Sequence, residues 1–391
     1  MDKLLVAYQQ KTYNMKILEL NKSLYPGGAE RFIVDLSNEL SKIEDNKVYL
    51  YTYMNESIPR NSFYRSQLRD KVNVKNIPCN NSLLSKLKLI FSIYKLINEL
   101  KPDVVHCHLS SFNFIVLPAL LNHKPFYVNT LHNLAEKNIK PGLDKFIKKI
   151  MYRAGIKPVT ISPLCYKSFT DYMGFNTSVM IENGCREIQK TSKFNDVINE
   201  IESYKFSKNT KVFINVARMH PQKNHQLLIE SFNRLIDRGF DAILLIIGSL
   251  DVDSTYTKKV MKSNHTDRVH FLGTKENVPD YLFASDAFCL SSLWEGAPIS
   301  LLEAGFAGCY PLCTPVGGCK DTIINNEWGM LSKDLSVDSY TEMLQEYMEQ
   351  QFYDRNRISN LYKGKYLMKE CATKYQNLFK NYIQSHHGKE F

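Results

Sequence analysis

The feature that most constrains the fold is an alternation of short apolar segments with helical segments, which runs along the chain twice. Strand candidates of the first series lie at 15–20, 48–53, 104–106, 128–131 and 159–162, and helices are expected at 29–40 and 83–100. Strand candidates of the second series lie at 212–217, 242–247, 269–272, 287–290 and 310–312. A helix is expected at about 224–238, after the first of these strands. Such alternation is typical of α/β units with a parallel sheet. The sequence therefore predicts two parallel α/β sheets in tandem.

The length of the chain agrees with two domains, because 391 residues exceed the size of one ordinary core. We expect the first domain at 15–185, joined by a C-terminal helix at about 365–385, and the second at 205–360. The polar stretch 184–208 is interpreted as the linker. Residues 1–14 are interpreted as an extension, or as the result of a start codon placed too early.

Composition favours a globular protein of the cytoplasm. The chain is 44% hydrophobic and 23% charged, as soluble domains are. It shows neither an apolar run of membrane-spanning length nor a signal-peptide pattern. Its nine cysteines include no Cys-x-x-Cys pair, which favours free thiols in a reducing compartment. Cys309, Cys313 and Cys319 lack zinc-site spacing and are expected to be buried thiols.

The net positive charge of the chain comes wholly from its N-terminal half. Residues 1–190 hold 27 Lys and Arg against 16 Asp and Glu, a net charge of +11, whereas the remainder carries −1. No aromatic-basic motif of an RNA-binding module accompanies this charge, so nucleic acid is not the expected partner. An anionic membrane surface or a phosphate-bearing lipid substrate fits better.

Two amphipathic segments of this half bear on that hypothesis. Their basic residues are Lys86, Lys88 and Lys95 within 83–100, and Lys145, Lys148, Lys149 and Arg153 around 146–152. Ordinary core faces with solvated lysines give the same pattern as peripheral membrane docking. Both interpretations stay open at this point.

A pair of carboxylates marks the most informative segment, Trp294–Ala304. Glu295 and Glu303 lie eight residues apart, after a short strand and around a proline suited to a first helical turn, Pro298. The amides of Gly296, Ala297, Ile299 and Ser300 are then expected near a helix N-terminus, which attracts anions. Carboxylates accept hydrogen bonds from sugar hydroxyls. The segment therefore indicates a nucleotide-sugar site.

Two cations accompany these carboxylates. Arg218 and Lys223 lie five apart between a strand end and a helix start, which is the ligand-bearing edge of an open α/β sheet. Such a pair can clamp a diphosphate, although loop cations are usually solvated. Asp251-Val252-Asp253 matches a metal-binding Asp-x-Asp pattern, but we interpret it as a polar loop, because cationic clamping removes the need for a divalent ion. No metal and no other cofactor is expected.

Other motifs carry weaker signals. Gly27 and Gly28 do not form the Gly-x-Gly-x-x-Gly dinucleotide pattern and indicate a turn, where a missing Cβ permits close approach. His106 and His108 share one strand face, but the sequence offers no further ligands for a metal. A structural role or a role in the acceptor cleft is expected for them.

Taken jointly, the motifs resemble those of a family 4 retaining glycosyltransferase of the bacterial surface-polysaccharide type. The segments that carry the resemblance are Gly27–Arg31, Asp103–His108, Asn183-Gly184, Ala217-Arg218 with Lys223-Asn224, Glu295-Gly296 with Leu302–Ala304, and Gly317-Gly318. It covers residues 15 to about 382. It implies two Rossmann-like domains facing each other across a cleft (the GT-B architecture).

The resemblance also implies roles for single residues. Arg218 and Lys223 would neutralise the donor diphosphate, Glu303 would hold the ribose and Glu295 the hydroxyls of the transferred sugar. His132 matches a histidine that faces the reacting sugar, although the acidic residue that often follows is Asn133 here. A hydrogen-bonded structural histidine is the alternative for His132. Glu303 would otherwise be a residue favoured by the helix dipole.

The sequence therefore predicts a cytoplasmic hexosyltransferase that uses a nucleotide-diphosphate sugar, most simply a UDP-sugar. The expected acceptor is a glycan or a lipid-linked acceptor of surface-polysaccharide biosynthesis at the inner face of the membrane. Retention of configuration is implied by the family resemblance alone. Two alternatives remain open. One is a nucleotide-sugar epimerase on the same architecture, and the other is a non-catalytic nucleotide-sugar-binding subunit of a transferase complex.

Overall fold

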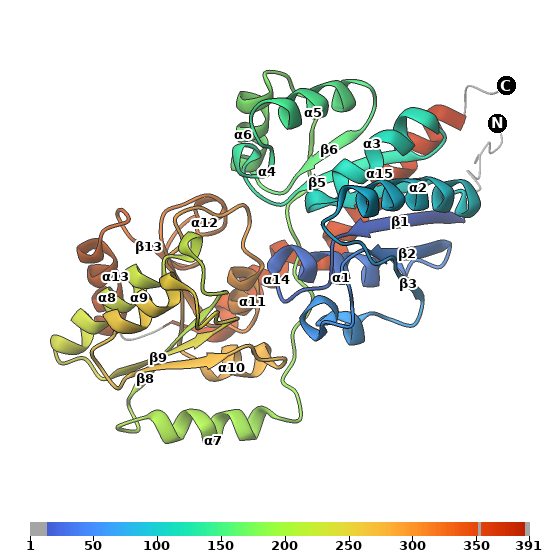
Figure 1. Ribbon diagram of the computed structural model, residues 1–391. Helices are drawn as coiled ribbons and strands as arrows, with labels where there is room; N and C mark the ends of the chain where they lie inside the picture. Colours follow the sequence, from blue (N-terminus) through green and yellow to red (C-terminus); the bar gives the residue numbers. More distant parts are fainter. Residues whose placement is uncertain (1–13, 351–352, 388–391) are drawn as a thin grey trace, which may run out of the picture.

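The computed structural model describes residues 14–350 and 353–387, and in these ranges the chain folds around two parallel sheets (Figure 1). Each sheet is covered by helices, as the alternating sequence pattern predicts. The fold prediction of two Rossmann-like α/β domains is thus confirmed. Apart from Asn14, the segment 1–14 lies outside the described residues.

The N-terminal sheet has seven strands in the order β3-β2-β1-β4-β5-β6-β7. They are β1 (Met15–Asn21), β2 (Asn46–Thr52), β3 (Val72–Asn76), β4 (Val104–His108), β5 (Phe126–Leu131), β6 (Lys157–Thr160) and β7 (Val179–Met180). The helices between them are α1 (Gly28–Leu40), α2 (Leu83–Leu100), α3 (Phe112–Leu121), α4 (Ala135–Asn138), α5 (Leu143–Arg153) and α6 (Pro163–Met173).

The C-terminal sheet has six strands in the order β10-β9-β8-β11-β12-β13. They are β8 (Lys211–Val216), β9 (Ala242–Ile247), β10 (Val269–Gly273), β11 (Ala287–Leu290), β12 (Tyr310–Cys313) and β13 (Met330–Leu331). The helices are α7 (Phe194–Tyr204), α8 (His225–Asp237), α9 (Thr255–Ser263), α10 (Val278–Ala284), α11 (Ile299–Phe306), α12 (Gly318–Thr322), α13 (Val337–Glu349), α14 (Arg355–Tyr366) and α15 (Met368–His387). All nine cysteines are free and all but Cys79 are buried.

The chain passes between the two sheets at two places that lie side by side. Cys185 and Leu367 form a parallel bridge, in which the amide of Cys185 donates to Tyr366 (2.7 Å) and Cys185 accepts from the amide of Met368 (2.8 Å). After this bridge α15 returns to the first domain, where its Gln376 bonds Asn46 on β2. The final helix is therefore built into the N-terminal half (Figure 1).

Three local expectations differ from the structure. The stretch interpreted as a linker contains α7, which buries Val197 and Ile201 and packs against α10. Pro298 is not in the first turn of α11 but precedes it with an extended backbone (ψ 116°). Lys148 is not solvated, since it is buried and pairs with Asp144 four residues earlier (3.0 Å).

Candidate active site

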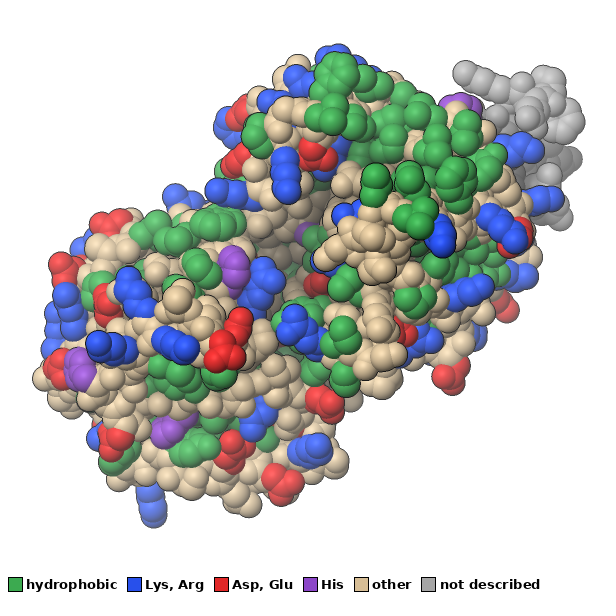
Figure 2. Space-filling view, viewed as in Figure 1, with side chains coloured by type: hydrophobic (Ala, Val, Ile, Leu, Met, Phe, Trp, Pro, Cys, Tyr) green, Lys and Arg blue, Asp and Glu red, His purple; other side chains and the backbone are tan. Residues whose placement is uncertain are grey.

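A cleft of about 550 Å³ lies between the two domains and is lined by loops from both (Figure 2). Every site residue predicted from the sequence lines it: Gly27, Gly28, His132, Arg218, Lys223, Glu295, Gly296, Ala297, Pro298, Ile299, Ser300 and Glu303. The residues come from segments as far apart as α1 and α11. The fold thus brings together one set of side chains that local sequence pattern could only suggest piece by piece.

The cationic side of the cleft follows β8. Arg218 comes just after this strand, and Lys223 ends the short 3-10 helix at Pro221–Lys223. Lys223 Nζ lies 2.5 Å from Glu295 Oε1, which also accepts a hydrogen bond from Ser292 Oγ. Arg218 makes no ion pair with any residue that the structure describes. An unpaired guanidinium that lines the cleft can bind an added anion.

Glu30, on the opposite domain, lines the same cleft and lies within electrostatic reach of Arg218. Burial raises the pKa of Glu30 to about 6, and the positive charge of Arg218 is among the effects that oppose the rise. Glu30 stands three residues after Gly27, the N-cap of α1, and a Cβ at Gly27 would meet its carboxylate at 2.5 Å. Gly27 therefore leaves room for this carboxylate, which would have to move aside if a Cβ were added.

The segment before α11 brings the C-terminal domain against the N-terminal domain. Ser162 Oγ donates to the carbonyl of Gly296 (3.2 Å) and Asn183 Nδ2 donates to that of Ala297 (3.0 Å). A Cβ at Gly296 would lie 2.6 Å from the carbonyl oxygen of His132. The amides that open α11 lack acceptors within the helix. The loop therefore carries free donors into the cleft while its carbonyls hold the two domains together.

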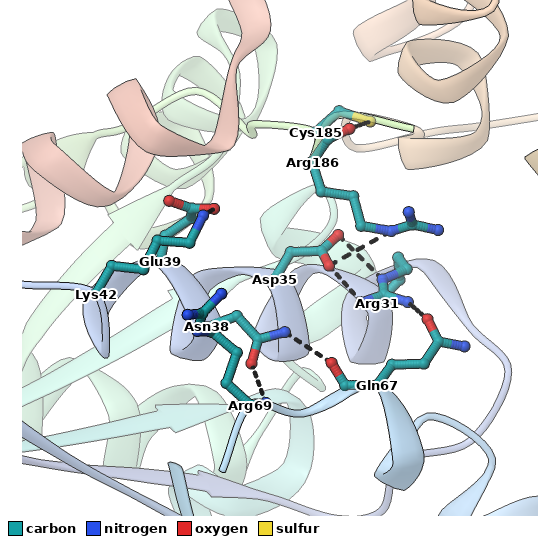
Figure 3. A network of polar contacts seen from close by, with 9 residues as sticks. All are labelled: Arg31, Asp35, Asn38, Glu39, Lys42, Gln67, Arg69, Cys185 and Arg186. Carbon is teal, nitrogen blue, oxygen red and sulfur yellow. Dashed lines mark hydrogen bonds and ion pairs between the residues drawn. The ribbon is translucent and has the colours of Figure 1, made fainter. Parts of the chain in front are cut away.

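Glu303 is buried and is the fifth residue of α11, beyond the turn where the helix dipole acts. Burial raises the pKa of Glu303, and Arg186 and Arg31 act against that rise. These two arginines belong to a network around Asp35 on α1 (Figure 3). Arg31 Nε donates to Asp35 (3.0 Å), and Arg186 Nε lies 3.7 Å from the same carboxyl group. Glu303 is thus a buried carboxylate with cations nearby.

His132 is half-buried at the end of β5, and its Nε2 lies 3.0 Å from His108 Nδ1. His106 and His108 are fully buried on β4, and their common partner is Glu19 on the neighbouring strand β1. Ligand atoms of these three residues lie within 4.8 Å of one another. The distances would suit a metal ion, but they equally suit hydrogen bonds, and the donors and acceptors match without one. The sequence offered no partner for the two histidines because Glu19 is distant along the chain.

Sequence reasoning also missed several residues of the cleft. Glu30 and Arg31 stand in a motif that carried the family resemblance, but no role was assigned to them, and Tyr25, Lys137 and Lys275 gave no signal at all. The spacing of Arg31 and Asp35, one helical turn apart, was the available hint of an ion pair. Asp251 and Asp253 are exposed and do not line the cleft.

Comparison with known proteins finds glycosyltransferase families in both halves of the chain. The family described as "Glycosyltransferase Family 4" matches residues 26–185, and the family described as "Glycosyl transferases group 1" matches residues 196–364. One relative is the UDP-Gal:α-D-GlcNAc-diphosphoundecaprenol α-1,3-galactosyltransferase of Escherichia coli. It is 29% identical over 299 residues, which are 71% of this chain and 75% of that protein.

A second relative, from Campylobacter jejuni, is named as a GalNAc-α-(1→4)-GalNAc-α-(1→3)-diNAcBac-PP-undecaprenol α-1,4-N-acetyl-D-galactosaminyltransferase. It is 25% identical over 330 residues, which are 81% of this chain and 84% of that protein. Among solved structures, Anabaena HepE in complex with UDP and glucose superposes with a TM-score of 0.79 at 15% identity, over 94% of this chain and all of HepE. The fold, the cleft and these likenesses together place the chain among the glycosyltransferases of GT-B architecture.

Proposed function

We propose that the protein transfers a hexosyl residue from a UDP-sugar to a lipid-linked glycan, with retention of the anomeric configuration. The observation that carries the proposal is the meeting of Arg218 and Lys223 with Glu295 and Glu303 in one cleft. Cations suit the diphosphate of such a donor and carboxylates suit its hydroxyls. The name of the Escherichia coli relative specifies a UDP-sugar donor, and both relatives above are named for undecaprenol-linked acceptors. Retention rests on the family resemblance.

In this proposal the chain assists the departure of the diphosphate. The bond between the anomeric carbon and the diphosphate oxygen breaks, and the acceptor hydroxyl oxygen bonds to that carbon and loses its proton to the leaving diphosphate. Negative charge develops on the leaving phosphate as the bond breaks. Arg218 and Lys223 stabilise that charge, with the amides of the first turn of α11. Lys223 is held by Glu295 before any donor arrives, so its ammonium group is already positioned. Glu295 would then accept hydrogen bonds from the sugar while it keeps Lys223 in place.

The N-terminal domain offers a surface for the membrane that a lipid-linked acceptor requires. Large apolar side chains of α2, α3 and α5 are exposed there, and Figure 2 shows them gathered on one side of the molecule. We call this surface the apolar face, and its residues are Leu83, Leu84, Leu87, Phe91, Leu117, Leu120, Leu121, Leu143, Phe146 and Ile150. Leu83 is 74% exposed and Leu143 is 71% exposed. A contiguous exposed patch of this kind marks an interaction site.

Exposed basic side chains accompany the apolar face. Lys86, Lys88 and Lys95 lie on α2, and Arg153 ends α5. None of the helices that the structure describes is long and apolar enough to span a bilayer. Apolar side chains flanked by lysines favour binding at an anionic lipid surface. We therefore propose a peripheral position at the inner face of the membrane.

A transfer assay tests the proposed function. The purified protein would be incubated with each of several labelled UDP-hexoses and with polyprenyl-diphosphate-linked GlcNAc, and label would be measured in the lipid phase. We expect label in the lipid phase from one donor and none without the acceptor. Conversion of the donor to its epimer without acceptor would favour the epimerase, and transfer only after addition of a second protein would favour the non-catalytic subunit.

A further inference from the structure

A chain of hydrogen bonds runs from the cleft into the N-terminal sheet. His132 Nε2 lies 3.0 Å from His108 Nδ1, and His108 Nε2 lies 2.8 Å from Glu19 Oε2. Glu19 and His108 are both 0% exposed. The other nitrogen of His132, Nδ1, has no protein partner within the described ranges. The side-chain atoms that are both unpaired and fully buried do not include it, so it must be accessible to solvent. This atom is therefore open to the cleft that His132 lines.

A second arm leaves Glu19 on the side away from the cleft. His106 Nδ1 lies 3.2 Å from Glu19 Oε1, and His106 Nε2 lies 2.8 Å from Thr130 Oγ1. Thr130 Oγ1 in turn lies 2.9 Å from the hydroxyl of Tyr375 on α15. The carboxylate is thus shared between an arm that reaches His132 and an arm that ends within the protein.

The direction of each hydrogen bond in the first arm follows from charge. Burial alone would raise the pKa of Glu19, but its two histidine partners outweigh burial and lower the pKa to about 2. An ionised carboxylate can only accept, so His108 donates from Nε2. Burial lowers the pKa of His108 to about 4, so its ring is neutral at pH 7 and carries a single proton. Because that proton is on Nε2, Nδ1 carries none and must accept. The proton between the two rings therefore belongs to His132 Nε2.

We propose that Glu19, acting through His108, fixes His132 as the neutral Nε2–H tautomer, so that His132 presents a hydrogen-bond acceptor to the cleft. Glu19 and His108 are then positioning residues for His132. The sequence indicated no role for Glu19, and for His108 it predicted a structural role or a role in the acceptor cleft. Second-sphere partners commonly fix the tautomer of a functional imidazole in this way.

The tautomer restricts what can bind beside His132. A bare imidazole nitrogen accepts from a hydroxyl or an amide N–H, and it repels a phosphate or carboxylate oxygen. Resting on the proposed function, this assigns His132 to a hydroxyl of the sugar or of the acceptor and leaves the diphosphate to Arg218 and Lys223. The tautomer can be measured without any sugar donor. Failure of the tautomer proposal is therefore distinguishable from failure of the proposed function, which the transfer assay tests.

Nitrogen NMR of the full-length, histidine-labelled protein tests the proposal. The signals of His132 are identified by their loss in His132→Gln. We expect a proton on Nε2, none on Nδ1, and a scalar coupling between His132 Nε2 and His108 Nδ1 across the hydrogen bond. A proton on Nδ1 of His132 at pH 7, or a positively charged ring, would overturn the proposal in the wild-type protein, where folding is not in question.

Two variants show which residue fixes the tautomer. In His108→Phe we expect His132 to change from one tautomer to a mixture of both, while UDP affinity, measured by calorimetry, changes less than about 3-fold, because Arg218 and Lys223 are untouched. Thr130→Val removes a hydroxyl from the other arm and serves as the control, in which the signals of His132 stay as in the wild type. A mixture of tautomers in Thr130→Val, or a single unchanged tautomer in His108→Phe, would contradict the proposed route.

Discussion

At the scale of single residues, the cleft is organised by pairs of opposite charge that are made before a ligand binds. Lys223 holds Glu295 at 2.5 Å, and Arg31 and Arg186 both lie close to Asp35. Arg218 lines the same cleft and makes no ion pair with any residue of the described ranges. A preformed arrangement lowers the cost of ordering side chains when the donor binds.

Replacement of either clamp cation should weaken the binding of UDP. Arg218→Ala and Lys223→Ala should each cost roughly 2–4 kcal/mol in binding and turnover, because each removes a charge that faces the diphosphate. Calorimetry with UDP measures the affinity. Lys258→Ala, an exposed lysine on α9 of the same domain, is the matched control. Wild-type affinity in both clamp variants would place the diphosphate elsewhere.

The raised pKa of Glu30, about 6, gives a prediction about stability. Between pH 4.5 and about 6 the unfolded chain releases this proton before the folded one does. Glu30 therefore favours the folded state fully only below pH 4.5, and that contribution is lost as pH rises through about 6. The free energy of unfolding of Glu30→Gln, measured by chemical denaturation, should exceed that of the wild type by an amount that grows across this window to at most roughly 2 kcal/mol. A constant difference at pH 4, 5 and 8 would show that Glu30 does not titrate in this way.

Metal independence is a third prediction at this scale. Because Arg218 and Lys223 supply positive charge at the diphosphate, turnover in the transfer assay should survive EDTA. Asp251 and Asp253, which lie outside the cleft lining, should tolerate replacement by alanine. Loss of turnover on chelation, rescue by Mn²⁺ and inactivity of Asp251→Ala would together show that the Asp-x-Asp loop binds a metal.

At the scale of elements, apolar runs predicted the long central strands and the helices with one apolar face. The elements that the pattern missed include β3 and β7, which are short or half-exposed, and α3, which is apolar apart from Asn113 and so lacks a separate polar face. Pairing between strands was beyond it. Glu19 meets the two histidines because β1 and β4 pair in the register that sets Glu19 opposite His106, and register between distant strands cannot be read from either segment alone. Loop residues such as Arg218 and Glu295 were predictable because strand ends share one edge of a sheet.

The loop before α11 gives a prediction at the scale of elements. Gly296 touches the backbone of His132 and Asn133 across the cleft, at 2.6 and 2.9 Å from where a Cβ would stand. Because backbone cannot yield as a side chain can, Gly296→Ala should push the domains apart, and small-angle scattering should report a larger radius of gyration. Gly364→Ala on α14, where a Cβ would meet nothing within 4 Å, is the control and should leave the radius unchanged. Equal radii for both variants would mean that the contact does not hold the cleft closed.

At the scale of the whole molecule, the division of charge agrees with the division of labour that we propose. The half with net charge +11 carries the apolar face, and the nearly neutral half carries the two clamp cations. The protein should therefore bind anionic vesicles better than neutral ones, and added salt should weaken the binding, since charges are screened over about 8 Å at physiological ionic strength.

Charge reversal on α2 tests this face. Each lysine near an anionic surface contributes about 1 kcal/mol, so joint replacement of Lys86, Lys88 and Lys95 by glutamate should abolish most vesicle binding and leave UDP affinity intact. Lys148, one of the lysines first expected to be solvated, is unsuitable because it is buried against Asp144. The same reversal at Lys258, Lys259 and Lys262 on α9 is the control. Equal binding to neutral and anionic vesicles, or none to either, would assign the basic half to a soluble acidic acceptor.

The bridge between Cys185 and Leu367 has a mechanical consequence. The two segments that pass between the domains are joined by hydrogen bonds of 2.7 and 2.8 Å. The pair of segments can bend together, but one cannot slide along the other without breaking both bonds. If the cleft opens, we expect a rotation about this pair of segments. Arg186 directly follows Cys185, so it lies next to the axis of such a rotation and would be displaced little by it. We therefore expect the positive charge of Arg186, which acts on Glu303 in this structure, to stay near it when the cleft opens.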